Sequence, residues 1–136
     1  MTPEEIVTAF IGLKAVSKAS LYEAFDVYFS EVTIWENIGL SRSQGVEKAK
    51  HVLKNAENMG VETIRVEILH QCSKGNLVVN ERVDHIMDKC GKELLALRAM
   101  GIFEVINGKI TSWRDYCDIS ALRLPTQRVE NAMDQP

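Results

Sequence analysis

The residues most capable of chemistry lie in a stretch that alternates like a β-strand, residues 78–86, Val-Val-Asn-Glu-Arg-Val-Asp-His-Ile. Because successive side chains of a strand point to opposite faces, Arg82 and Asp84 share one face with Asn80 and Ile86. An arginine and an aspartate two residues apart among apolar neighbours predict a buried or half-buried ion pair. Most such pairs are structural, so a pair that only stabilises the sheet is the competing interpretation.

A second acid follows in residues 109–116, which also read as a strand. Trp113 and Asp115 share one face of that strand, which favours an inward-facing carboxylate beside an aromatic side chain. In the alternative interpretation, Asp115 or Asp118 begins the turn after the strand. The spacing alone does not choose between these two acids.

Two carboxylates bridged by one guanidinium can carry out acid–base catalysis. The planar fork of an arginine holds both acids in a defined geometry. When two desolvated carboxylates lie close together they repel, so one ionises while the other retains a proton. The pair then supplies a general acid and a general base in one pocket. This suits an epoxide, since its oxygen needs a proton and its carbon needs an activated water.

Trp35 and Asn37 are a third candidate pair. They lie two apart in residues 32–37, Val-Thr-Ile-Trp-Glu-Asn, a β-rich stretch that we expect to be the first strand. They therefore share a face. A core tryptophan and a strand-end asparagine explain the same pattern equally well.

The sequence lacks the common catalytic motifs. It contains no P-loop, no GxGxxG and no HExxH. Residues 39–43, Gly-Leu-Ser-Arg-Ser, lack the second glycine of a nucleophile elbow. Asp84, His85, Asp88 and Cys90 are metal-ligating residue types, but the first two point to opposite faces of a strand, so we expect no metal ion.

Length and composition indicate one globular domain over residues 1–136. Apolar residues make up 46% and charged residues 26%, which argues against disorder. The net charge of -3 and the pI near 5.6 lack the basic excess of nucleic-acid-binding proteins. No apolar run approaches the roughly 18 residues that span a bilayer, so we expect no membrane association. An acidic N-terminus without signal-peptide features, and three cysteines without CxxC spacing (Cys72, Cys90 and Cys117), predict a cytoplasmic protein with reduced thiols.

Three helices are expected in the first half of the chain. The first covers residues 3–16, with Thr2 as its N-cap. The second begins at Ser20, where Ser20 and Glu23 have the spacing of a capping box. The third covers residues 46–59 and follows the first strand.

Strands joined by short turns make up the second half. Asn107-Gly108 is the strongest hairpin signal, since both positions favour positive φ. Helices followed by an antiparallel meander indicate an α+β fold, in which a long curved sheet closed on one side by helices forms a cone around a pocket. The expected segments are a loop at 41–45, strands at 61–71, 77–87, 93–106 and 109–116, turns at 73–76 and 88–92, and a loose tail at 125–136.

Four short strings together resemble the limonene-1,2-epoxide hydrolase family: Asn80-Glu-Arg-Val-Asp84, Gly101-Ile-Phe103, Asn107-Gly-Lys-Ile110 and Trp113-Arg-Asp-Tyr116 followed by Asp118. Each string is weak alone, but the resemblance covers most of the chain. It implies the cone-shaped α+β fold of the cystatin-like, nuclear transport factor two-like and SnoaL-like proteins, with a curved mixed sheet under N-terminal helices. It also implies a homodimer, no metal and no organic cofactor.

The resemblance assigns roles to the candidate residues. Asp84 would be the general acid that protonates the epoxide oxygen, and Asp115, rather than Asp118, would be the base that takes a proton from the attacking water. Arg82 would bridge the two acids, and Asn37 would hold the water. The ring would open in one step, without a covalent ester.

The implied pocket is apolar, with one departure from the family. Its lining would be Ile86, Leu97, Ala99 and Trp113, together with Trp35. Members of the family usually have a tyrosine in place of Trp35, and its hydroxyl contacts the water. An indole donates one hydrogen bond but accepts none. Trp35 also takes more volume than a tyrosine, so the preferred substrate is expected to differ from limonene oxide.

Two other functions are compatible with the same residues. An isomerase or cyclase acting on a steroid-like or polyketide-like substrate would need one carboxylate base and separate oxyanion donors. A non-catalytic ligand carrier or dimerisation module would use Arg82 and Asp84 only as a buried pair.

Overall fold

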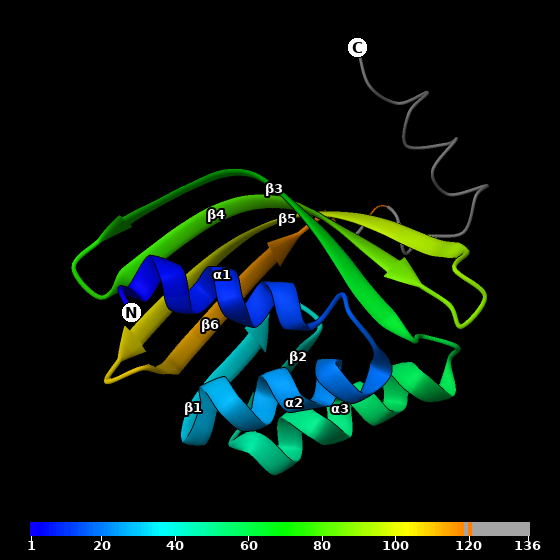
Figure 1. Ribbon diagram of the computed structural model, residues 1–136, viewed down its shortest axis with the longest axis horizontal. Helices are drawn as coiled ribbons and strands as arrows, with labels where there is room; N and C mark the ends of the chain where they lie inside the picture. The colour runs from blue at the N-terminus through cyan, green and yellow to red at the C-terminus, as the bar shows by residue number, and fades with distance from the viewer. Residues whose placement is uncertain (119, 121–136) are drawn as a thin grey trace.

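The computed structural model describes residues 1–118 and 120, so the predicted tail at 125–136 lies outside the described residues. Two helices open the chain, and a third separates the first two strands from the remaining four (Figure 1). The elements are α1 Pro3–Leu13, α2 Lys18–Tyr28, β1 Phe29–Asn37, β2 Ser41–Gln44, α3 Val46–Asn58, β3 Thr63–Lys74, β4 Leu77–Met87, β5 Glu93–Ile106 and β6 Lys109–Cys117.

The strands form one six-stranded mixed sheet in the order β2-β1-β6-β5-β4-β3. All neighbours are antiparallel except β1 and β6, which run parallel. The sheet curves over the helices: α1 packs against β3, β4 and β5, while α2 and α3 lie toward β1 (Figure 1). The predicted α+β fold with a curved mixed sheet under N-terminal helices is confirmed. None of the described helices is long and apolar enough to cross a membrane.

The starts of α1 and α2 follow local capping rules, and the start of α2 differs from the prediction. At α1, Thr2 is the N-cap, as predicted. At α2 the predicted start was wrong: Ser17 is the N-cap, and its hydroxyl accepts a hydrogen bond from the backbone N–H of Ser20. The hydroxyl of Ser20 in turn accepts from the N–H of Ser17, so Ser20 closes the capping box that begins at Ser17 and does not begin one of its own. The first helix ends at Leu13, before the exposed Val16.

The strands of the meander have the predicted positions. β4 and β5 have the predicted bounds, β6 is one residue longer, and β3 is shifted by two to three residues. Two differences lie near the first strand. β1 begins at Phe29, and residues 41–44, expected as a loop, form the edge strand β2 that pairs with the end of β1. The sequence Ser-Arg-Ser-Gln has no β-branched residue, so its strand conformation comes from the unpaired edge of β1.

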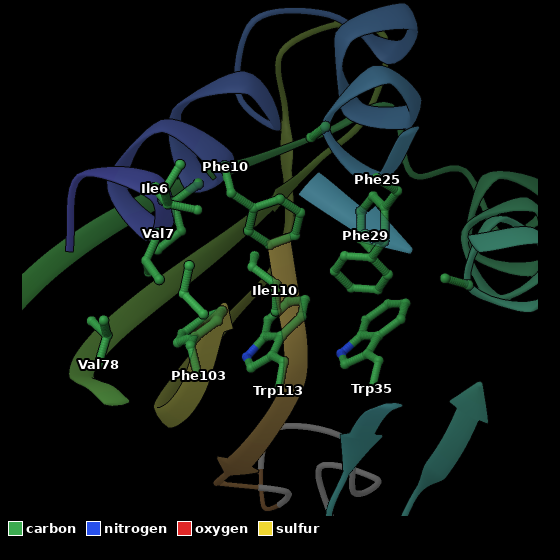
Figure 2. Packing of buried hydrophobic residues seen from close by; sticks show 14 of the residues in the cluster. Ile6, Val7, Phe10, Phe25, Phe29, Trp35, Val78, Phe103, Ile110 and Trp113 are labelled. Carbon is green, nitrogen blue, oxygen red and sulfur yellow. The ribbon is translucent and has the colours of Figure 1, made fainter. Parts of the chain in front are cut away.

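Aromatic rings dominate the core between α1, α2 and the sheet. Phe103, Trp113 and Trp35 lie opposite one another on β5, β6 and β1 and form a continuous stack (Figure 2). The centroids of Phe103 and Trp113 are 5.1 Å apart, and those of Trp113 and Trp35 are also 5.1 Å apart. Phe10 of α1 and Phe25 of α2 cover this stack edge-on or tilted. The stack forms a rigid apolar wall beside the polar residues described next.

Candidate active site

Arg82 lies fully buried on β4 and binds two carboxylates at once. Its Nε donates to Oδ1 of Asp84 at 3.1 Å, and its Nη2 donates to Oδ2 at 3.0 Å. Toward Asp115 of β6, Nη1 donates to Oδ1 at 3.1 Å and Nη2 to Oδ2 at 2.6 Å. Both acids are buried as well. The structure therefore brings together the three residues that the sequence grouped, and each carboxylate receives two charge-assisted hydrogen bonds.

The side chain of Arg82 reaches Asp115 by crossing β5, the strand between them. In the sheet register, Ala99 lies opposite Arg82, and Gly101 lies opposite both Asn80 and Asp115. An added Cβ at Gly101 would lie 2.5 Å from Nη1 of Arg82. Small residues on β5 thus leave the space through which the guanidinium bridges two non-adjacent strands.

Three further polar side chains hold this bridge in place. Trp113 donates from Nε1 to Oδ1 of Asp115 at 2.6 Å, and Nη1 of Arg82 donates to Oδ1 of Asn80 at 2.8 Å. Asn80 Nδ2 donates to Gln71, at 3.1 Å. The sequence placed Asn80 on this face but gave it no role, and its contact with Gln71 of β3 depends on the pairing of strands.

Burial and charge act in opposite directions on the bridge. Desolvation disfavours the charged form of Arg82, but the attraction of Asp115 and the hydrogen bonds to Asp84 outweigh it and raise the pKa of the guanidinium. Desolvation also works to raise the pKa of Asp84. The hydrogen bonds and charge of Arg82, assisted by the charge of Lys14, outweigh this and lower that pKa below its usual value. Asp84 is therefore ionised in the free protein at neutral pH.

Beside the bridge lies a cavity of about 120 Å³. Four of the predicted lining residues face it, as do Asn37 and both acids; the four are Trp35, Ile86, Leu97 and Trp113. Ala99 does not: it is buried on β5 beside Arg82, where it makes room for the guanidinium. The sequence analysis did not identify the other lining residues, which are Lys14, Phe25, Leu53, Ile64 and Cys117.

Asn37 enters the site through the parallel pairing of β1 with β6, which places it opposite Asp115. Its Nδ2 donates to Oγ of Ser41 at 3.2 Å. This hydrogen bond fixes the orientation of the amide group and therefore also the position of its oxygen. The competing acid, Asp118, accepts from the backbone N–H of Ser120 in the turn after β6 and does not line the cavity.

Lys14 is the functional candidate that the sequence analysis missed. Its side chain is only 2% exposed, and its Nζ lies 4.8 Å from the ring centroid of Trp113 and 5.2 Å from that of Phe10. Burial lowers its pKa to about 8, although the charge of Asp84 opposes the shift. Its spacing could have identified it, because Lys14 follows Val7 and Phe10 on the same face of a helix, and that face is apolar.

His85 points away from the cavity, as the alternation of β4 requires. It lies close to Glu67 and Glu93 on the neighbouring strands. The residues Asp84, His85, Asp88 and Cys90 therefore do not converge on one point. Cys117 lies at the cavity, where burial raises the pKa of its thiol to about 11.

A known protein family matches nearly the whole chain. The family model of the limonene-1,2-epoxide hydrolase catalytic domain matches residues 2–128. The chain belongs to the limonene-1,2-epoxide hydrolase family. Among curated proteins, epoxide hydrolase EphG of Mycobacterium tuberculosis is 30% identical over 98 residues, which are 72% of this chain and 63% of EphG.

Solved structures similar to this member of the limonene-1,2-epoxide hydrolase family show the same fold. A limonene-epoxide-hydrolase-like epoxide hydrolase from M. tuberculosis has a TM-score of 0.70 at 24% identity, covering 96% of this chain and 91% of that one. A putative SnoaL-like polyketide cyclase from Shewanella denitrificans has a TM-score of 0.73 at 14% identity, covering 95% and 97%. The fold is therefore shared by proteins named for different reactions, and the reaction must be argued from the side chains.

Proposed function

We propose that this protein is an epoxide hydrolase that adds water to a small apolar epoxide, giving a vicinal diol in one step without a covalent intermediate. The observation that carries the proposal is the buried bridge in which Arg82 holds Asp84 and Asp115 beside an apolar cavity. The bridge fixes an acid and a base at separate positions in one desolvated pocket, which is what ring opening by water requires.

In this mechanism Asp115 and Asn37 hold the attacking water. As the water oxygen forms a bond to a ring carbon, one of its protons passes to the carboxylate of Asp115. The bond between that carbon and the ring oxygen breaks, and the oxygen receives a proton from the side of Asp84. Arg82 stays charged throughout and couples the two acids, so that gain of a proton by one favours loss of a proton by the other.

The size of the cavity limits the substrate. About 120 Å³ is less than the volume of a site for a drug-sized ligand. The stacked rings of Trp35 and Trp113 form one wall, and packing against Phe25 and Phe103 restricts their movement. We therefore expect compact apolar epoxides of the size of cyclohexene oxide to be turned over faster than limonene oxide.

The test is turnover of a panel of epoxides by the purified protein, with diol formation followed by chromatography. Asp84→Asn and Asp115→Asn keep the side-chain shape, and each should lower the rate by roughly 100- to 10,000-fold. Glu4→Gln, a change of a half-buried α1 residue that does not line the cavity, serves as the control. Circular dichroism of each variant shows whether the fold persists. Absence of turnover with every epoxide would contradict the proposal.

A second candidate is an isomerase or cyclase, favoured by one specific observation. Nε1 of Trp35 is buried and has no hydrogen-bond partner among the described residues. A free donor at the cavity could bind the oxygen of an enolate, and Asp115 could remove a proton from carbon. Exchange of deuterium into the carbon next to a ketone, with no epoxide turnover, would support this candidate.

Two further proposals concern the oligomeric state and the cellular location of the protein. We propose a homodimer, which sedimentation of the purified chain tests, since a monomer at working concentrations would contradict it. We also propose a cytoplasmic location, which fractionation of the source cells tests.

A further inference from the structure

The charges at the cavity raise the question of where the acid proton is held. Arg82 donates two hydrogen bonds to each carboxylate, and this stabilises the ionised form of both acids. With Asp84 and Asp115 both ionised, the bridge carries a net charge of minus one. In this state neither carboxylate carries the proton that an opening epoxide needs.

Lys14 is placed to balance that charge. Together with Arg82, its ammonium makes the number of buried cations equal to the number of buried carboxylates. It lines the same cavity as both acids, and its Nζ makes no hydrogen bond or ion pair among residues 1–118 and 120. An ammonium has three N–H donors, and here the charges of Asp84 and Asp115 and the ring faces of Trp113 and Phe10 compensate its burial in place of hydrogen bonds. The ammonium of Lys14 thus holds a proton at the cavity, and no hydrogen bond to the described residues strengthens its hold on that proton.

We propose that Lys14 holds the acid proton in the free protein and that the proton passes through Asp84 to the epoxide oxygen. This inference rests on the proposed epoxide hydrolase function. An apolar substrate that fills the cavity expels water and favours the neutral pair, amine and carboxylic acid, over the charged pair.

The proton transfers balance. As the substrate enters, an N–H bond of Lys14 breaks and, through one intervening water, an O–H bond forms on Asp84, since Nζ makes no direct hydrogen bond to that carboxylate. That O–H bond then breaks as the ring oxygen becomes a hydroxyl, while the carbon–oxygen bond of the ring opens and water supplies the new one. Asp115 takes the proton of the water. After the diol leaves, Asp115 releases a proton to solvent and Lys14 regains one.

The pH dependence of this proton involves every charged group around Lys14. From β4 these are Arg82 and Asp84, and from β6 they are Asp115 and the thiol of Cys117. The residues that line the cavity from α2, α3, β1, β3 and β5 are uncharged. Burial lowers the pKa of Lys14 to about 8, so we expect the rate to fall above about pH 8 as the site loses its proton.

Two substitutions distinguish a Lys14 that stores a proton for the reaction from a Lys14 that only supplies a positive charge. In Lys14→Met, one carboxylic acid must hold the proton, so the alkaline fall in kcat/KM should move to lower pH by at least about one unit. At pH 8 the rate should then be roughly tenfold lower, and the loss should become smaller as the pH falls. Lys14→Arg keeps the charge but holds its proton permanently, so it should be the less active variant at pH 7. Lys48→Met, an exposed change in α3, should leave the profile unchanged.

The outcomes are distinct. A role of Lys14 as a charge alone predicts that Lys14→Arg is close to wild type and more active than Lys14→Met, and this order would overturn the proposal. An unchanged alkaline fall of kcat/KM in both variants would also overturn it, while the hydrolase function would stand.

If Lys14→Arg does not fold, nuclear magnetic resonance of ¹³Cε-lysine in the wild-type protein and in Asp84→Asn replaces it. Loss of Asp84 should lower the pKa of Lys14, and an unchanged pKa would contradict the proposed transfer. Absence of turnover by the wild-type protein would instead contradict the proposed function itself.

Discussion

Gly101 lies directly beneath the guanidinium of Arg82, and a Cβ added there would come within 2.5 Å of Nη1 and within 2.6 Å of Oδ1 of Asp115. The backbone of Gly101 needs no positive φ, so the glycine is required for space rather than for conformation. The absence of a side chain at Gly101 of β5 thus permits Arg82 of β4 to bind Asp115 of β6.

This contact leads to a prediction for Gly101→Ala. The methyl group would displace the guanidinium, and we expect a loss of about 1–3 kcal/mol in the free energy of unfolding. Epoxide turnover should fall roughly 100-fold, since small displacements of a catalytic group cost about this much. Urea unfolding and steady-state rates measure the two effects. Gly12→Ala in α1 is the matched control: its Cβ would meet nothing within 4 Å, and it should leave turnover unchanged. Normal turnover in Gly101→Ala would show that the bridge can shift without loss of function.

Trp35 leads to a second prediction, because its indole cannot accept a hydrogen bond from the attacking water. Trp35→Tyr supplies an oxygen near Asn37 and Asp115, and we expect a gain of about 1 kcal/mol in positioning the water, or roughly fivefold in rate. Trp35→Phe removes about the same ring volume without supplying the oxygen. Comparison of the two variants therefore distinguishes the effect of the hydroxyl from the effect of the larger cavity. Rates with a compact epoxide measure the difference. Equal rates for the two variants would show that the hydroxyl has no part in holding the water.

The buried Lys14 leads to a third prediction, about stability at alkaline pH. Its pKa is about 8 in the folded protein and 10.5 in the unfolded chain. Between these values the unfolded state binds more protons, so the free energy of unfolding rises with pH, by at most about 3 kcal/mol from this group. Cys117 acts in the opposite direction, since burial raises the pKa of its thiol to about 11.

The measured quantity is therefore the difference between the wild-type protein and Lys14→Met, with Cys117 present in both. Urea unfolding at pH 7.5, 9 and 10 should show the wild-type protein gaining stability relative to the variant as the pH rises. Lys48→Met, which changes an exposed lysine, should follow the wild-type protein. A constant difference between the wild-type protein and Lys14→Met over this range would mean that Lys14 has an ordinary pKa.

The sequence by itself determined most of the sheet and one face of the site. Alternation along residues 78–86 placed Arg82 and Asp84 on a common face, and the hairpin signal at Asn107-Gly108 predicted that residues 93–106 pair with residues 109–116. These features depend on spacing within one strand or across one short turn, and such local geometry follows directly from the chain.

Tertiary structure decided what lies across the cavity. The parallel pairing of β1 with β6 places Asn37 opposite Asp115, and no local signal predicts which distant strands pair. The same is true of Lys14, which is polar by type but lines the cavity with the acids because α1 packs over the concave face of the sheet. Its pKa and its proposed role arise from burial beside two carboxylates. Burial depends on contacts between residues far apart in the chain, so only the folded structure determines it.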